Sequence, residues 1–138
     1  MTALAEIQIH KPIVKVWDAL VDAASHPHWL GPGCTTHYKD ELRPGCRFTC
    51  TSARDGSKRE GEIVSLRARE FLKTRVDLSA DHFEMVEYHL FEVDGQCRVR
   101  IVCEVFDTGE SHHGYFVEVV DQNLKQTLER FKTYCERG

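Results

Sequence analysis

Two polar side chains in segments of alternating hydrophobicity are the best candidates for chemistry in this sequence. Tyr88 lies between Val86 and Leu90. If these three residues share the inner face of a strand, the Tyr88 hydroxyl needs a hydrogen-bond partner in the protein or on a ligand. Asp40 is the second candidate, because burial beside Phe48 would raise the pKa of its carboxyl and suit it to acid–base chemistry. An exposed position near a strand end is the alternative interpretation of Asp40.

The eight histidines and six cysteines form no recognisable metal or redox motif. Those that come closest together in the sequence are His26, His28, Cys34, His37, His112 and His113. Their spacings match no zinc signature and no Cys-x-x-Cys pair occurs, so we expect no metal and no cofactor. The histidines are instead expected at the surface or in loops. Most of the cysteines are expected to be reduced and to act as small buried hydrophobic residues.

Composition excludes several classes of partner. The net charge is −4 and no block of basic residues occurs. Because phosphate binding needs a concentrated basic face, this charge pattern argues against nucleic acid or an anionic membrane as partner. The apolar runs are only a few residues long, far short of a membrane span. The N-terminal residues lack the basic and apolar regions of a signal peptide, so we expect a cytoplasmic protein.

The periodicity of apolar residues predicts an α+β protein. A short strand over residues 5–9 is followed by a helix starting at Pro12, where the missing N–H costs nothing, and by a second helical piece over residues 25–30. Six strands are then expected over residues 36–42, 46–52, 59–66, 71–78, 83–93 and 96–106. A helix of about six turns starts at His113. These elements predict one domain over residues 1–138, in which a curved antiparallel sheet wraps around the long C-terminal helix.

The last predicted hairpin has a register that can be worked out from its turn. Asp94-Gly95 favours a two-residue type I′ turn, which places Val93 opposite Gln96. The inner face then contains three cross-strand pairs, Val86 with Cys103, Tyr88 with Ile101, and Leu90 with Val99. The outer face contains Met85 with Glu104, His89 with Arg100, and Phe91 with Arg98.

The first predicted hairpin is worked out in the same way. A three-residue turn at Arg43-Pro44-Gly45 would pair Leu42 with Cys46, Asp40 with Phe48, and Tyr38 with Cys50. In the following strand, residues 59–66, Ile63 competes with Val64 and Leu66 for the inner face, which predicts a β-bulge.

Three motifs give the sequence a resemblance to a known superfamily. They are the segment Lys11 to Leu20 with its Val16-Trp17 pair, the hairpin Glu41-Leu42-Arg43-Pro44-Gly45-Cys46-Arg47-Phe48, and the run from Gly61-Glu62-Ile63 to Phe71-Leu72. Together they resemble the SRPBCC superfamily, the helix-grip fold of START-like lipid-binding domains and polyketide cyclases. Within it the sequence is most similar to the C-terminal domain of the activator of the heat-shock chaperone ATPase. It departs from that pattern at Glu41, at Cys46 and around Phe116-Val117.

The resemblance implies an internal cavity between sheet and helix, usually for hydrophobic ligands. A helix that crosses a strongly bent sheet also leaves apolar space on physical grounds. We expect this cavity to be lined by Tyr38, Phe48, Leu72, Thr74, Val76, Val86, Tyr88, Leu90, Val99, Ile101, Val120 and Leu124. Simple core packing is the alternative at each position. Trp29 is expected either to plug the mouth of the cavity or to pack in the core.

Three functions remain open. The favoured one is non-enzymatic binding of a small hydrophobic or aromatic molecule in the cavity. The second is a cyclase or dehydratase in which Tyr88 and Asp40 polarise a carbonyl or move a proton. The third is a protein-interaction module like the chaperone activator, or a homodimer, using an outer apolar strip of Phe83, Met85, Phe91 and Phe106.

Overall fold

The computed structural model describes residues 2–30, 33–78, 82–107 and 113–137, without the side chains of residues 107 and 113–122. The elements in chain order are β1 (Thr2–Ile9), α1 (Ile13–Val21), a 3₁₀ turn (Ala23–Ser25), α2 (His26–Trp29), β2 (Thr35–Tyr38), β3 (Arg47–Thr51), β4 (Lys58–Arg67), β5 (Phe71–Asp77), β6 (His82–Val93), β7 (Gln96–Asp107) and α3 (His113–Arg137). The predicted order of elements is confirmed, with most boundaries shifted by one or two residues.

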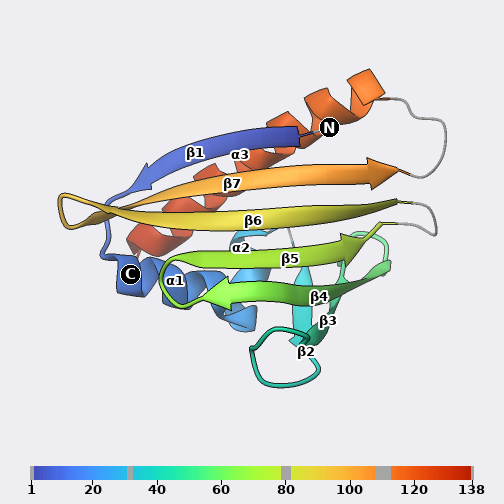
Figure 1. The fold of residues 1–138 in the computed structure, drawn as a ribbon, viewed down its shortest axis with the longest axis horizontal. Helices are drawn as coiled ribbons and strands as arrows, with labels where there is room; N and C mark the ends of the chain where they lie inside the picture. Colours follow the sequence, from blue (N-terminus) through green and yellow to red (C-terminus); the bar gives the residue numbers. More distant parts are fainter. Residues whose placement is uncertain (1, 31–32, 79–81, 108–112, 138) are drawn as a thin grey trace.

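One antiparallel sheet contains all of the strands described. Their order across the sheet is β1-β7-β6-β5-β4-β3-β2. The first strand, β1, therefore pairs with the last, β7, and the chain between β1 and β2 crosses from one edge of the sheet to the other. In Figure 1, α3 runs behind the sheet along β7 and β1, and α1 and α2 lie near its C-terminal end. The α+β class, with a curved antiparallel sheet and a long C-terminal helix, is therefore confirmed. No helix in the described ranges is both long enough and apolar enough to span a membrane.

The β6–β7 hairpin has the predicted register. Val93 pairs with Gln96, Tyr88 with Ile101, and the pairing continues to His82 and Asp107. Asp94 and Gly95 adopt φ values of 53° and 78°, the left-handed conformation that both central residues of a type I′ turn need. The turn therefore fixes which residues of β6 and β7 share a face with Tyr88, and the alternation of apolar residues makes that face the concave one.

The predicted pairing of β2 with β3 is wrong by two residues. Tyr38 lies opposite Phe48 rather than Cys50, and β2 ends at Tyr38. The backbone N–H of Lys39 donates to the carbonyl of Arg47 at 2.9 Å, after which the chain leaves the sheet. The connection is therefore a loop of several residues rather than a tight turn. Because the error is an even number, Tyr38 still shares the inner face with Phe48.

The predicted bulge in β4 is present. The register of β4 against β5 shifts between Ile63 and Ser65, which leaves Val64 as the extra residue. Ile63 is buried, whereas Val64 is 37% exposed. The bulge thus places both Ile63, opposite Thr74, and Leu66, opposite Leu72, on the inner face and leaves only Val64 off it.

Gly61 leaves room on this face for an aromatic ring. It lies directly opposite Phe48, and a Cβ atom at Gly61 would come within 2.3 Å of the Phe48 ring. The ring of Phe48 therefore lies flat over the glycine and forms part of the inner surface of the sheet.

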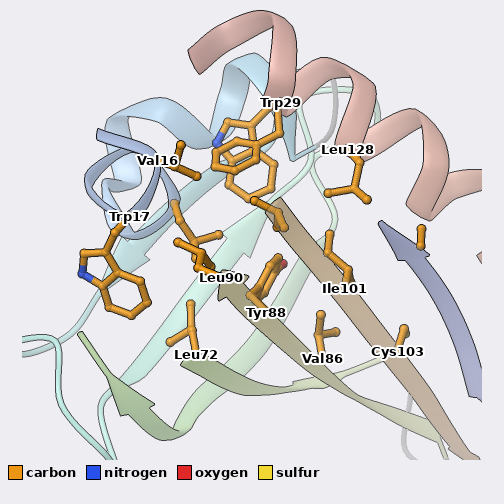
Figure 2. Packing of buried hydrophobic residues seen from close by; sticks show 14 of the residues in the cluster. Val16, Trp17, Trp29, Leu72, Val86, Tyr88, Leu90, Ile101, Cys103 and Leu128 are labelled. Atoms are coloured by element: carbon orange, nitrogen blue, oxygen red, sulfur yellow. The ribbon is translucent and has the colours of Figure 1, made fainter. Parts of the chain in front are cut away.

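The core lies between the sheet and the three helices. Figure 2 shows Val16 and Trp17 of α1, Trp29 of α2 and Leu128 of α3 above inner-face residues of the sheet. The Trp29 ring lies 4.5 Å from the ring of Phe131 of α3. Leu128 and Phe131 are buried as their helical spacing predicts, and Leu124 is half-buried. The side chains of Val117 and Val120 lie outside the described part.

Candidate functional site

A pocket of about 930 Å³ opens on the concave side of the sheet, between β2–β6 and the end of α1 with α2. Its sheet wall is mainly apolar and includes Phe48, Ile63, Leu72, Val76 and Val86. The helical wall is formed by Leu20, Trp29 and Leu30. A pocket of this size and lining suits a small organic ligand.

The pocket contains seven of the residues predicted to line it: Tyr38, Phe48, Leu72, Thr74, Val76, Val86 and Tyr88. Leu90, Val99 and Ile101 are buried elsewhere in the core, because α1 packs directly on β6 and β7 and leaves no space there. Leu124 is not part of the lining, and Val120 lies among the side chains that are not described. The pocket therefore faces α2 and the end of α1, rather than the described part of α3.

The mouth of the pocket is polar. The β3–β4 connection contributes Ser52, Arg54, Asp55 and Ser57 to the lining, and Arg59 at the start of β4 adds a guanidinium group. Apart from Ser52 these residues are exposed, so the pocket reaches solvent at this end. A ligand would thus enter past polar groups into an apolar interior.

Tyr88 places a free hydroxyl in this pocket. Its side chain is 9% exposed, and its ring meets Trp29 edge-on with centroids 6.5 Å apart. Among the described residues the hydroxyl has no hydrogen-bond partner, although nearly all buried polar groups have one. Burial, with a smaller contribution from Glu84, raises the pKa of Tyr88. The hydroxyl is therefore a neutral donor directed at the pocket.

Glu84 is a second polar group of the pocket, and the sequence reasoning missed it. It lies on the inner face two residues before Val86, and the Cys103 thiol donates to its Oε2 at 3.6 Å. Burial raises the pKa of the Glu84 carboxyl, because the charged form is poorly solvated there. The alternation that placed Val86 and Tyr88 inward extends to Glu84, so the signal was present in the sequence.

Tyr38 and Thr74 differ in how their hydroxyls are bonded. Tyr38 donates to the backbone carbonyl of Val21 at 3.1 Å, which fixes its ring beside the end of α1. Thr74 is buried, and no partner for its hydroxyl occurs in the part of the chain that the structure describes. Thr74 and Tyr88 therefore leave polar atoms for a ligand, whereas the hydroxyl of Tyr38 is already used.

Of the two interpretations of Asp40, the exposed position is correct, and the inward orientation that an acid or base in the pocket would need is wrong. It lies in the loop beyond β2 and is exposed, accepting hydrogen bonds from the Glu41 backbone N–H and the Arg43 guanidinium. These two interactions lower the pKa of the Asp40 carboxyl. A strand that ended two residues later would have buried Asp40. Its local partners stabilise the loop instead.

One histidine contradicts the expectation of surface positions. His26 is buried in the pocket wall. Its Nε2 lies 2.9 Å from the Leu20 carbonyl and its Nδ1 lies 2.7 Å from the Thr36 hydroxyl. Burial lowers the pKa of His26 and so favours its neutral form. A carbonyl can only accept, so Nε2–H donates to Leu20, and in the neutral ring Nδ1 then accepts from Thr36.

Two half-buried thiols lie next to this pair. Thr36 Oγ1 is 3.7 Å from the Sγ of Cys50, and both Cys50 and Cys34 line the pocket. The described residues hold no group of three or more His, Cys, Asp or Glu side chains able to bind a metal ion.

The outer face carries the predicted apolar strip in an interrupted form. Phe83 and Phe106 stack with centroids 4.9 Å apart, and Arg75 lies 3.9 Å over the Phe83 ring. Arg100 lies 5.3 Å from the centroid of Phe91. Guanidinium groups thus interleave with these rings, and the strip is not a continuous apolar surface.

A curved antiparallel sheet, a long C-terminal helix and a pocket on the concave side define the helix-grip architecture of the SRPBCC superfamily. Residues 10–136 match the family described as Activator of Hsp90 ATPase homolog 1-like protein, and the chain belongs to this family.

Solved structures of the same fold are similar over nearly the whole chain. Protein MLL2253 from Mesorhizobium loti matches with a TM-score of 0.84 and 20% identity, covering 99% of this chain and 98% of that one. CalU16 from Micromonospora echinospora matches with a TM-score of 0.76 and 16% identity over 97% of this chain and 75% of that one. DynU16, a protein of the dynemicin biosynthetic locus, matches with a TM-score of 0.78 and 18% identity. The match covers 98% of this chain and 47% of DynU16. At these identities the likeness concerns the fold.

Proposed function

We propose that this protein binds a small, mostly apolar molecule in the pocket between β2–β6 and α2. The observation that carries the proposal is the unpartnered hydroxyl of Tyr88 inside an apolar pocket of about 930 Å³. The oxygen of this hydroxyl is accessible from the pocket and is free to donate to a bound acceptor. The resemblance to START-like lipid-binding domains supports the same class of ligand. The length of 138 residues suits a binder formed by one domain.

The polar groups of the pocket narrow the class of ligand. Tyr88 is a neutral donor, and burial favours the protonated, neutral form of Glu84. Both can then donate to a carbonyl, ether or hydroxyl oxygen. We therefore expect an aromatic or polycyclic molecule with at least one such oxygen, which enters past the polar mouth.

A thermal-shift screen of the full chain tests this proposal. The panel contains fatty acids, flavonoids and aromatic polyketides at saturating concentration. A ligand present at about 100 times its Kd stabilises the folded state by about 2.7 kcal/mol. We expect flavonoids or polyketides to raise Tm more than saturated fatty acids do. If no member of the panel protects the protein, the proposal fails.

A pair of variants shows where a hit binds. Val86→Phe adds volume inside the pocket, and Glu87→Phe places the same side chain on the opposite face of the same strand. We expect the Val86 variant to lose the thermal shift and the Glu87 variant to keep it. The opposite pattern would place the ligand elsewhere.

A second function, an enzyme of the cyclase or dehydratase kind, is favoured by Glu84. Asp40 cannot act in the pocket, but burial raises the pKa of the Glu84 carboxyl, which is the direction that suits a general acid or base. In this proposal Tyr88 polarises a ligand carbonyl and Glu84 moves the proton. Incubating a bound polyketide with wild type and with Glu84→Gln tests it. Turnover that depends on Glu84 supports an enzyme, and unchanged ligand in both samples supports a binder.

A further inference from the structure

Two arginines make the mouth of the pocket positively charged. Arg59 lines the pocket from the start of β4, and Arg54 lines it from the β3–β4 connection. Arg59 lies directly opposite Cys50 of β3 and four residues before Ile63, and both of these residues line the pocket. Its side chain therefore leaves the sheet on the inner face. The ladder of β3 with β4 fixes the backbone from which this guanidinium group extends.

The connection that carries Arg54 also has a defined position. The backbone N–H of Ser52 donates to the carbonyl of Ser57 at 2.9 Å, which closes the base of the connection. A Cβ atom at Gly33 would come within 2.6 Å of the Cβ of Ala53, so the chain before β2 packs closely against it. The second guanidinium group is thus held on a segment that lies beside the pocket.

Neither guanidinium group forms an ion pair within the described ranges. The acidic side chains nearby have other partners. Glu60 follows Arg59 in the sequence, but it points to the opposite face and pairs with Lys39 at 3.0 Å. Asp55 accepts a hydrogen bond from a backbone N–H of its own turn, and Glu84 accepts one from a thiol. Both arginines are therefore available to a ligand.

The mouth keeps this positive charge at neutral pH. Burial favours the protonated form of Glu84, and the charge of Arg59 opposes this effect only in part. Of the acidic residues that line the pocket, the exposed Asp55 is the one that is ionised. Two guanidinium groups thus face one carboxylate, although the whole chain has a net charge of −4.

A ligand that fills the pocket and covers its mouth removes water from Arg59. An uncharged ligand replaces that water poorly, because a charged group loses free energy when it is desolvated without a partner. A carboxylate replaces it well, because the guanidinium fork can donate two parallel hydrogen bonds to the two carboxylate oxygens. The charge at the mouth therefore selects for an anionic group at one end of the ligand.

We propose that the ligand is an aromatic or polycyclic carboxylic acid whose carboxylate pairs with Arg59 at the mouth of the pocket, assisted by Arg54. This inference rests on the proposed function and narrows its class of ligand. Arg59 and Tyr88 lie three inner-face positions apart along the strands. The carboxylate and the oxygen that accepts from Tyr88 therefore lie at opposite ends of an elongated molecule, with its apolar body between them.

The experiment compares anthraquinone-2-carboxylic acid with its methyl ester on the full chain at pH 7. Both molecules have ring carbonyls that can accept from Tyr88, but only the acid is charged. Quenching of tryptophan fluorescence measures Kd, since Trp29 lines the pocket. We expect a Kd about 5- to 30-fold lower for the acid, between the effect of an exposed ion pair and that of a charge-assisted hydrogen bond. High salt should weaken binding of the acid and leave the ester unchanged.

The possible outcomes separate this inference from the proposed function. Equal affinity, or tighter binding of the ester, would overturn the carboxylate and leave a binder of neutral molecules. If neither molecule binds, a carboxylate does not secure an aromatic ligand and this inference fails. The proposed function is judged separately, by the screening panel.

Variants locate the carboxylate. Arg59→Gln should bind the acid as weakly as the ester, and Arg59→Lys, which keeps the charge without the two parallel donors, should retain part of the preference. Arg47→Gln is the matched control, because Arg47 is exposed on the opposite face of the neighbouring strand β3 and does not line the pocket. It should keep the full preference. Urea denaturation checks that all three variants fold. A preference for the acid that survives Arg59→Gln would refute the assignment.

Discussion

Replacing Tyr88 by phenylalanine removes one oxygen atom and leaves the ring in place. In the ligand-free protein the hydroxyl has no partner among the described residues, although the side chain is only 9% exposed. Removing it therefore breaks no hydrogen bond of the fold. We expect the free energy of unfolding without ligand to stay within about 0.5 kcal/mol of wild type, or to rise.

The effect on binding should be larger. A hydrogen bond from a neutral donor contributes about 0.5–1.5 kcal/mol, which corresponds to roughly a 2- to 12-fold increase in Kd. Urea denaturation of the ligand-free protein and a fluorescence titration with a ligand found in the thermal screen measure the two quantities separately. The change in Kd should appear for ligands with a carbonyl oxygen and vanish for a hydrocarbon analogue.

Tyr38→Phe is the matched control. Its hydroxyl lines the same pocket but donates to the Val21 carbonyl at 3.1 Å. This variant should lose about 1 kcal/mol of stability without ligand and change Kd little. If Tyr88→Phe proves the more destabilising of the two in the absence of ligand, its hydroxyl has a partner within the protein. The argument for a ligand acceptor would then be refuted.

Four further substitutions test the fold and the electrostatics of the pocket. Gly61→Ala would push a Cβ to within 2.3 Å of the Phe48 ring, so we expect a loss of about 1–3 kcal/mol in urea denaturation. Gly95→Ala meets no neighbouring atom but keeps φ at 78°, which should cost about 1–2 kcal/mol. Burial lowers the pKa of His26 below 6.5 in the folded state. The contribution of His26 to the free energy of unfolding is therefore full above pH 6.5 and falls as the pH drops below that value. His26→Gln should flatten this pH dependence. Burial raises the pKa of Glu84 above 4.5, so stability falls as the pH rises through the folded-state pKa, and Glu84→Gln should be more stable than wild type at pH 7.

The sequence was sufficient wherever a local signal determined the geometry. Asp94-Gly95 sets a turn that only a few residue types tolerate, and alternation then assigns each residue of β6 and β7 to a face. The inward position of Tyr88 followed from these two facts. The same rule places Glu84 on the inner face, because it precedes Tyr88 by four residues in β6.

The β2–β3 loop could not be predicted because its conformation depends on side-chain contacts. Asp40 accepts hydrogen bonds from Glu41 and Arg43, and the backbone N–H of Cys46 donates to Arg43 at 3.0 Å. The bond from Cys46 to the Arg43 carbonyl and the φ of 91° at Gly45 show that Pro44-Gly45 does form a tight turn, but this turn lies inside a wider loop. Alternation gives the face of a strand residue, but it does not show where the strand ends.

The position of the pocket depended on contacts between distant segments. A stripe of apolar residues shows which face of α3 is buried, but not over which strands the helix lies. The short α2 contributes Trp29 and His26 to the pocket wall, whereas sequence patterns assign these residues only general roles. His26 could not be recognised as buried, because its partners at Leu20 and Thr36 belong to a helix and a strand that meet only in the fold.

The polar groups of the pocket are arranged in two separate sets. Tyr88 and Thr74 lie on the sheet among apolar residues and have free hydroxyls, so they suit recognition of a ligand oxygen. His26, Thr36 and Cys50 lie where α2 meets the edge formed by β2 and β3, and Thr36 contacts both of the other side chains. A ligand that loses affinity in Tyr88→Phe but keeps it in Cys50→Ser would show that recognition depends on the first set alone. A ligand that loses affinity in both variants would have to contact both sets.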